Sequence, residues 1–245
     1  VATGIFGIGT FSCDIVRVNL SDGSFETVAA ISCDQRPVSI AIEIEDGGDT
    51  ALVATSQRFQ GRDSSIFRVN LNTGVVTFLA SCPRCNAPYL AIEQGGGSAL
   101  FLGHGNNALM RFDLSTFAQD IIARSLTPLG LARLSGGVEV MTISSGSGFL
   151  GGELSRVFLN TGIVMPVAEM QPPYSFTLSA NEQTAFVTTN ALGNALLQRV
   201  DIASGFIENI ASLPHFGRGL ALEDGGETAL VTIHNPANST GSLLR

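Results

Sequence analysis

Short apolar runs alternate along the whole chain with turns rich in Gly, Asn and Asp. Apolar runs of five or six residues bounded by such turns are typical of buried strands joined by hairpins. We therefore expect four strands, A to D, in antiparallel order in each copy of the pattern. In the clearest copy the expected strands cover residues 38–43, 50–55, 66–71 and 75–80.

The four-run pattern recurs from one end of the chain to the other. An arginine marks strand C of each copy, with an apolar residue directly after it in the first five, and successive arginines are 51, 43, 45, 43 and 46 residues apart. Repeats of this length built from short strands are typical of β-propellers, in which each repeat is one four-stranded blade. We predict an all-β fold and a single β-propeller domain over residues 1–245. The arginines are Arg17, Arg68, Arg111, Arg156, Arg199 and Arg245.

The sequence begins and ends within a copy of the repeat. Residues 1–3 match the end of strand B, and the last copy stops during strand C. We predict four complete blades of four antiparallel strands and two partial blades. Because exposed edge strands favour aggregation, we interpret the chain as a fragment, truncated at both ends, of a propeller with six or more blades.

The recurring strand-C arginine invites a functional interpretation, but its regular spacing favours a structural one. A residue that appears once per copy at one point in the unit repeats a structural role. We predict that each of these arginines pairs with a carboxylate or caps backbone carbonyls near a turn.

Composition excludes some classes of partner. The net charge is −8, which disfavours nucleic acid. No apolar run approaches the roughly 18 residues of a membrane helix, so we predict no membrane insertion. With 44% apolar residues and 28 glycines, the chain can bury a large core and connect it by tight turns.

The loops of the predicted propeller divide into two classes. The A-to-B and C-to-D turns are short and uniform, and we call the face that carries them the constant turn face. The B-to-C and D-to-A loops vary in length and content and form the opposite face, the variable loop face. Variable loops on a rigid scaffold usually carry binding, so we place the candidate site on the variable loop face.

Polar residues of the variable loop face are the candidate ligand contacts. His104, Asn190 and His234 end strand B of their copies, where the alternative role is to satisfy local backbone groups as turn residues. The D-to-A loops carry four cationic or titratable side chains that suit a carboxylate or a phosphate; alternatively, these are isolated solvated charges. These side chains are Arg36, Arg84, His215 and Arg218.

All four cysteines also fall in variable loops or at their borders. Cys13, Cys33, Cys82 and Cys85 include only one pair with the CxxC spacing, whereas a structural zinc site usually has two such pairs. We expect disulfides and an extracellular or periplasmic protein, with free thiols as the alternative.

Three motifs of the second copy, in residues 37–43, 51–55 and 66–74, resemble the extracytoplasmic propellers of the gluconolactonase-like, NHL and YVTN groups. The resemblance implies a propeller of six to eight blades that is often secreted. Gluconolactonase-like enzymes hold a divalent metal with a glutamate and with Asn or Asp residues, one of them at the start of strand A. The strand-A starts of this chain contain neither Asn nor a carboxylate, so we predict no metal and no cofactor.

Two functions follow from these observations. The first is a non-catalytic binding or interaction propeller that recognises a protein or a small-molecule ligand through the variable loop face. The alternative is a hydrolase or lyase, lactonase-like or streptogramin-lyase-like, with His104 or His234 as general acid or base. We favour binding, because no nucleophile and base can be placed together from the sequence.

Overall fold

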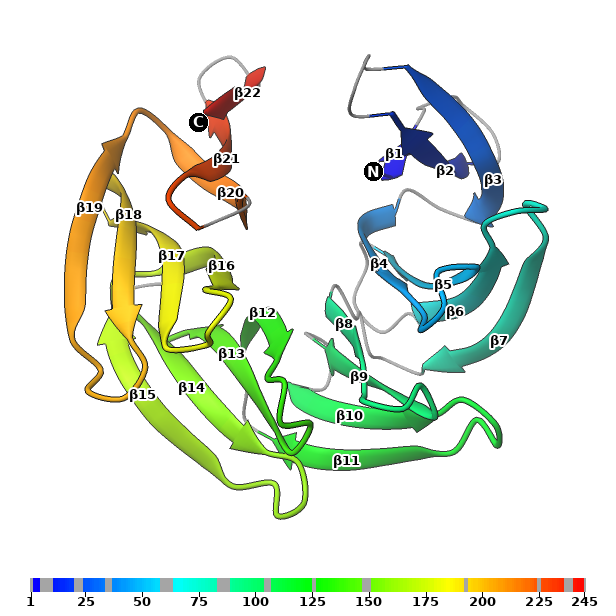
Figure 1. The fold of residues 1–245 in the computed structure, drawn as a ribbon, viewed down its shortest axis with the longest axis horizontal. Helices are drawn as coiled ribbons and strands as arrows, with labels where there is room; N and C mark the ends of the chain where they lie inside the picture. The colour runs from blue at the N-terminus through cyan, green and yellow to red at the C-terminus, as the bar shows by residue number, and fades with distance from the viewer. Residues whose placement is uncertain are drawn as a thin grey trace. The chain divides into compact units, whose positions relative to one another are not determined.

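In the computed structural model of the chain, every described element is a β-strand (Figure 1). No helix among the described residues could span a membrane. The expected all-β fold is confirmed.

For Cys13, Cys33 and His234 only the backbone is described. The structure describes all residues except 1, 5–10, 20–23, 34–36, 58–63, 83–88, 104–106, 125–126, 147–150, 192–193, 224–225, 236–239 and 245.

The chain divides into two compact units, Val1–Arg124 and Ser125–Arg245, and each is described by itself. The first unit has one three-stranded and two four-stranded sheets. These are β1 (Ala2–Gly4), β2 (Phe11–Val18) and β3 (Phe25–Cys33); β4 (Pro37–Ile44), β5 (Thr50–Gln57), β6 (Ser64–Asn70) and β7 (Val76–Cys82); and β8 (Tyr89–Ile92), β9 (Ser98–Gly103), β10 (Ala108–Asp113) and β11 (Gln119–Arg124).

The second unit has two four-stranded sheets and one three-stranded sheet. These are β12 (Pro128–Arg133), β13 (Glu139–Ser145), β14 (Gly152–Phe158) and β15 (Val164–Met170); β16 (Pro173–Leu178), β17 (Thr184–Ala191), β18 (Asn194–Asp201) and β19 (Ile207–Leu213); and β20 (Phe216–Leu222), β21 (Ala229–Asn235) and β22 (Thr240–Leu244).

Each sheet is a meander in which strands adjacent in sequence pair antiparallel. The strands expected at 38–43, 50–55, 66–71 and 75–80 correspond to β4, β5, β6 and β7, with boundaries that differ by at most two residues. The order of strands A to D is therefore confirmed. The described residues form six sheets, one for each repeat, and the number of complete blades stays a prediction.

Sheets pack face to face within each unit, and the middle strands supply the core. In the first unit Leu52 and Ile66 belong to the same buried cluster as Phe101 and Phe112 of the next sheet. The rings of Phe101 and Phe112 lie edge to face, 5.8 Å apart. In the second unit Met141 belongs to a cluster that spans the sheets β12–β15 and β16–β19. The buried middle strands thus hold successive sheets together.

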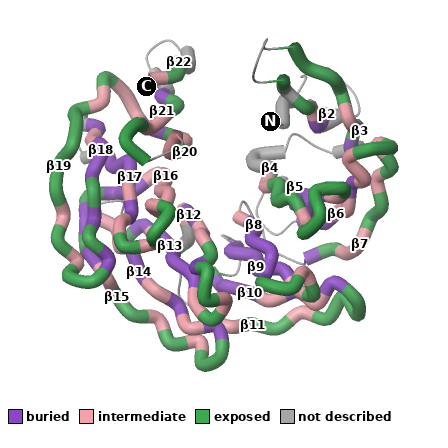
Figure 2. The backbone as a smooth tube through the Cα atoms, viewed as in Figure 1, coloured by how far each residue is buried: buried purple, intermediate pink, exposed green. Residues whose placement is uncertain are grey.

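The last strand of each four-stranded sheet lies at the outer edge, and most of its residues are exposed or half-buried (Figure 2). First strands contact each other on the opposite, inner side, as β12 contacts β16 and β16 contacts β20. This order places the start of strand A, which the D-to-A loop reaches, on the inner side of each unit.

The predicted pairing of the repeated arginines is confirmed for the five that the structure describes. Arg68 and Arg111 each form two hydrogen bonds with the glutamate that directly follows strand A, Glu45 or Glu93. Their bonds bridge the first and third strands across the second, close to the A-to-B turn. The arginine therefore ties together three strands of its own blade.

The other arginines use different carboxylates. Leu134 stands where Glu93 stands in its copy, and Arg156 pairs instead with Glu139, the first residue of strand B. Arg17 and Arg199 pair with a glutamate on strand D, Glu26 and Glu208 respectively. The arginine position repeats along the chain, whereas its partner does not.

Candidate functional site

A β-bulge interrupts the first strand of each sheet in the second unit. The pairing of β12, β16 and β20 with the second strand skips one residue near the strand start. The skipped residues are Leu129, Tyr174 and Arg218. Because a bulge bends its strand and re-aims the bulged side chain, these positions depart from the simple alternation of a strand.

Two consecutive bulges bring an aromatic ring and a cation together. The Arg218 guanidinium lies over the ring of Tyr174, with 4.9 Å between Cζ and the ring centroid. The ring of Phe216, at the start of β20, lies 5.9 Å from that of Tyr174 at an angle of 58°. We call Tyr174, Phe216 and Arg218 the aromatic–arginine site.

The guanidinium of this site is available to a ligand. Arg218 is exposed, and among the described residues it has no ion pair with a carboxylate. A cation over a ring face is attracted by the ring quadrupole, and because this contact is not a hydrogen bond it uses none of the arginine N–H donors. The five N–H donors of arginine are fixed in a planar fork that suits a carboxylate or a phosphate.

A buried hydroxyl from the preceding sheet supports the bulge at Arg218. Thr188 of β17 is fully buried, and its hydroxyl donates to the carbonyl oxygen of Gly217 over 3.1 Å. The Ser175 hydroxyl lies 2.9 Å from the Thr188 hydroxyl. A Cβ at residue 217 would lie 2.7 Å from the Thr188 methyl carbon, so this close approach of backbone and side chain requires glycine.

The structure places four of the predicted site residues in the second unit. His215 directly precedes β20, Arg218 lies near its start, and Phe216 pairs through its backbone with His234 of β21. The Asn190 backbone N–H donates to the carbonyl of Pro172, two residues before Tyr174. Asn190 Oδ1 is buried and has no hydrogen-bond partner among the described residues. All four therefore lie at the end of their sheets that carries the variable loops.

The remaining predicted residues fall largely outside the described part of the chain. His104, Arg36, Arg84 and Cys85 are not described, nor are the side chains of Cys13, Cys33 and His234. Cys82 is described: it is 2% exposed, and its sulfur lies 4.0 Å from that of Met110.

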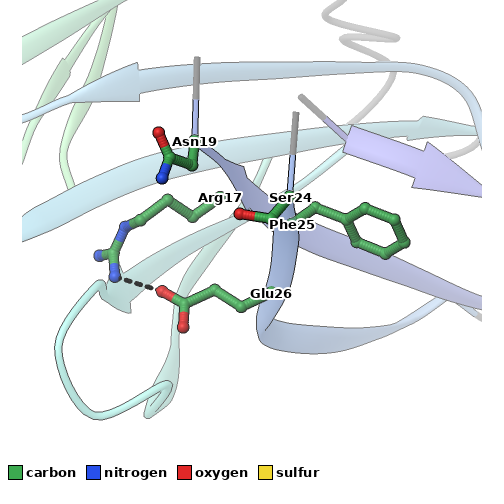
Figure 3. Close-up of a pocket in the computed structure, with 5 residues that line it drawn as sticks. All are labelled: Arg17, Asn19, Ser24, Phe25 and Glu26. Carbon is green, nitrogen blue, oxygen red and sulfur yellow. Dashed lines mark hydrogen bonds and ion pairs between the residues drawn. The ribbon is translucent and has the colours of Figure 1, made fainter. Parts of the chain in front are cut away.

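A pocket of about 440 Å³ lies at the turn between β2 and β3, on the constant turn face (Figure 3). The Arg17 guanidinium in this pocket faces Glu26, while the ring of Phe25 points away from it. Arg17 donates to Glu26 over 2.6 Å and to the Leu71 carbonyl over 2.8 Å. These contacts link two neighbouring sheets, so the pocket belongs to the repeated arginine framework.

A second pocket, of about 550 Å³, lies on the variable loop face of the sheet β12–β15. Its polar lining includes Ser144, Glu153 and Glu169, and the two glutamates are direct neighbours across β14 and β15. The Ser155 hydroxyl donates to Glu153. Among the described residues no cluster of three or more His, Cys, Asp or Glu side chains could hold a metal ion.

Sequence reasoning missed Tyr174 and Phe216. Both stand at the start of an apolar run, where an aromatic residue is ordinarily part of the core. The available signal was that Tyr174 and Arg218 follow the loop before strand A at equivalent positions in consecutive copies. Only the pairing in the structure, which skips Tyr174 and Arg218, reveals that these two residues leave the regular strand pattern.

Solved structures of other proteins share this fold. TolB from Acinetobacter baumannii has a TM-score of 0.64 and 18% identity over 96% of this chain, which spans 59% of the TolB chain. A chain of the nidogen/laminin complex has a TM-score of 0.69 and 10% identity, over 97% of this chain and 90% of that one. A candidate 6-phosphogluconolactonase from Bacteroides fragilis NCTC 9343 has a TM-score of 0.56 and 11% identity, over 100% of this chain and 93% of that one.

No family model matches the sequence, and no curated protein matches it either. At these identities a structural likeness establishes the fold and leaves the chemistry to the site itself. The successive antiparallel sheets and the structural neighbours lead to one conclusion: this chain has a β-propeller fold.

Proposed function

We propose that this chain is a non-catalytic binding propeller that recognises a partner through the variable loop face of its second unit. One observation carries the proposal: an exposed arginine lies over a tyrosine ring at two consecutive bulges. Aromatic residues and arginine are the side chains most enriched among energetically dominant interface contacts. The nidogen structure, a propeller of similar fold, is that of a complex with laminin.

The chemistry of the described site favours binding over hydrolysis. Tyr174, Phe216 and Arg218 offer a ring surface and a guanidinium, which is neither a nucleophile nor a general base. A hydrolase would need a nucleophile or an oriented general base. The similarity to a candidate lactonase concerns the fold and supplies no such group.

We further propose that the protein functions outside the cytoplasm, in an extracellular or periplasmic setting. Cysteines placed on loops of a secreted protein commonly form disulfides. The burial of Cys82 beside Met110 supports a structural rather than a reactive role for this cysteine. Peptide mapping under non-reducing conditions tests this: we expect cross-linked peptides that contain Cys82, and four free thiols would contradict the proposal.

Binding is tested by capture on three immobilised proteins. They are the native chain, a Tyr174→Ser/Arg218→Ser variant of the variable loop face, and an Ile163→Ser/Phe206→Ser variant. Ile163 and Phe206 lie at C-to-D turns of the same unit and are 55% and 67% exposed, which makes this variant a matched control for the constant turn face.

The ligand source is the extracellular or periplasmic fraction of the organism that encodes the chain. We expect the native chain and the constant-face variant to retain the same molecule, and the variable-face variant to lose it. Equal retention by all three proteins would contradict the proposal. Hydrolysis of gluconolactone or 6-phosphogluconolactone by the native chain above the uncatalysed rate would favour the enzyme instead.

A further inference from the structure

We propose that the aromatic–arginine site recognises a planar carboxylate attached to an apolar body, and that Thr188 is the residue that positions Arg218 for it. This inference rests on the proposed binding function and names the chemistry of the group that is bound. It joins two observations: the guanidinium over the Tyr174 ring, and the buried hydroxyl bond to Gly217, the residue next to Arg218.

The charge of the site selects an anion. The chain has a net charge of −8, so its surface as a whole repels anions, and Arg218 is an exposed exception without a carboxylate partner among the described residues. A carboxylate meets the arginine fork through two parallel N–H···O bonds. The contact with Tyr174 is an attraction between the charge and the ring face, not a hydrogen bond, so the two interactions use different features of the guanidinium.

The rings select what the anion is attached to. Tyr174 and Phe216 lie 5.9 Å apart at the strand starts, and both are only half-buried. An apolar group attached to the carboxylate would cover ring surface that is now in water, and aromatic pairs prefer centroid separations of this size. A free inorganic phosphate could use the fork but has no apolar body for the rings.

Thr188 fixes the backbone from which Arg218 extends. Its hydroxyl is buried and reaches from β17 across to the carbonyl of Gly217 on β20. Ser175, beside the other bulged residue Tyr174, contacts the same hydroxyl. One threonine hydroxyl therefore contacts the residues next to both bulges. Without its hydroxyl the Gly217 carbonyl would lose this partner, and Arg218 would lose its fixed position over the ring.

The test uses small acids and NMR of a protein labelled with ¹³C at its tyrosine rings. The chain has two tyrosines, so a Tyr89→Phe variant assigns the Tyr174 signals. Benzoate, benzamide, phenyl phosphate and inorganic phosphate are titrated separately. We expect benzoate alone to shift Tyr174 strongly and saturably. Benzamide tests the need for charge, and the two phosphates test the preference for a carboxylate.

Variants separate the roles of the residues. We expect Arg218→Lys to weaken benzoate binding at least tenfold, because lysine lacks the planar fork. Thr188→Val should weaken it about threefold to tenfold, and Thr188→Ser, which keeps the hydroxyl, should restore most of the affinity. Arg199→Lys, which changes another exposed arginine of the same unit, is the matched control and should bind benzoate as the native chain does.

Each contrary result has a definite meaning. If both phosphates shift Tyr174 as strongly as benzoate does, the preference for a planar carboxylate is wrong. If no acid shifts Tyr174 while partner capture still depends on Tyr174 and Arg218, this inference is wrong and the binding function stands. If Thr188→Val binds benzoate normally, Thr188 is not a positioning residue. The benzoate and Arg218→Lys measurements hold even if Thr188→Val fails to fold.

Discussion

The guanidinium of Arg111 and the carboxylate of Glu93 form two parallel hydrogen bonds, 2.6 Å from Nε to Oε2 and 2.7 Å from Nη2 to Oε1. Glu93 is 7% exposed, and the Ser98 hydroxyl also donates to it. The hydrogen bond to Glu93 raises the pKa of Arg111 above its ordinary value, so the guanidinium stays charged. Arg199 and Glu208 form the corresponding pair at the surface, where about half of each side chain is exposed.

Glu93→Gln should therefore destabilise the protein more than Glu208→Gln does. Removing the charge of Glu93 leaves a partly buried arginine without its counterion, which we expect to cost about 2 kcal/mol of unfolding free energy. The exposed pair contributes at most about 1 kcal/mol. Urea unfolding followed by circular dichroism measures both. Equal losses for the two variants would show that burial does not determine the strength of these pairs.

The C-to-D turn after Asp113 should weaken in acid. Asp113 Oδ1 accepts bonds from the Ser115 hydroxyl and from the backbone N–H groups of Ser115 and Thr116. The Ser115 hydroxyl first, and then these N–H groups, hold the pKa of Asp113 well below its usual value of 3.8. A lowered folded-state pKa means that the carboxylate stabilises the fold above pH 3.8, and that this stability is lost as the pH falls below 3.8.

Asp113→Asn removes the charge and keeps a side-chain oxygen that can accept the hydrogen bonds of the turn. Asn70 occupies the equivalent turn of its copy, where its amide oxygen accepts from the N–H groups of Asn72 and Thr73. An asparagine can therefore keep the turn without titrating. We expect the urea midpoint of the native chain to fall more between pH 5 and pH 2.5 than that of the variant. Parallel pH profiles would argue against a role for Asp113 in acid sensitivity.

Gly74→Ala should cost more stability than Gly48→Ala. Both glycines have positive φ, 71° and 78°, so alanine pays a backbone strain of about 1 kcal/mol at either position. A Cβ at residue 74 would in addition collide with the Val28 carbonyl of the neighbouring sheet, whereas residue 48 faces open space. We expect Gly74→Ala to lower the free energy of unfolding by about 3 kcal/mol. Equal melting temperatures for the two variants would mean that the sheets adjust to the methyl group without cost.

The sequence predicts the strands well because each is an apolar run with a turn on either side. Residues 50–55 became β5 (Thr50–Gln57), for example, since a middle strand is buried on both faces and its pattern is set by the core. The partner of the strand-C arginine could not be predicted as readily. Glu93 directly follows strand A of its copy, whereas Glu208 lies on strand D, and only the folded sheet decides which carboxylate lies within reach.

The candidate site was only partly predictable for a related reason. Arg218 stood out as a charge in a D-to-A loop, but Tyr174 was indistinguishable from a core aromatic residue at a strand start. Their contact depends on a skipped residue in each strand and on the packing of β16 against β20. Neither feature has a signature in hydrophobic periodicity, because a bulge shifts the register by a single residue.

Placing a carboxylate at residue 179 should recreate the buried type of arginine pair. The Ser179 N–H donates to the Thr184 carbonyl just as that of Glu93 donates to Ser98, so Ser179 occupies the position of Glu93 in its copy. Thr184 would supply the hydroxyl that Ser98 supplies to Glu93. We therefore expect the carboxylate introduced by Ser179→Glu to lie within reach of Arg199.

A double-mutant cycle of Ser179→Glu with Arg199→Met isolates this interaction from the loss of the Ser179 hydroxyl bonds. We expect a favourable coupling of about 1 kcal/mol from urea unfolding. When Ser179→Glu is present, Glu208→Gln should lower the free energy of unfolding less than it does in the native chain, because Arg199 then pairs with the carboxylate at residue 179. A coupling energy near zero would mean that Arg199 does not reach a carboxylate at residue 179. The backbone at the end of strand A would then differ between this copy and the copy that contains Glu93.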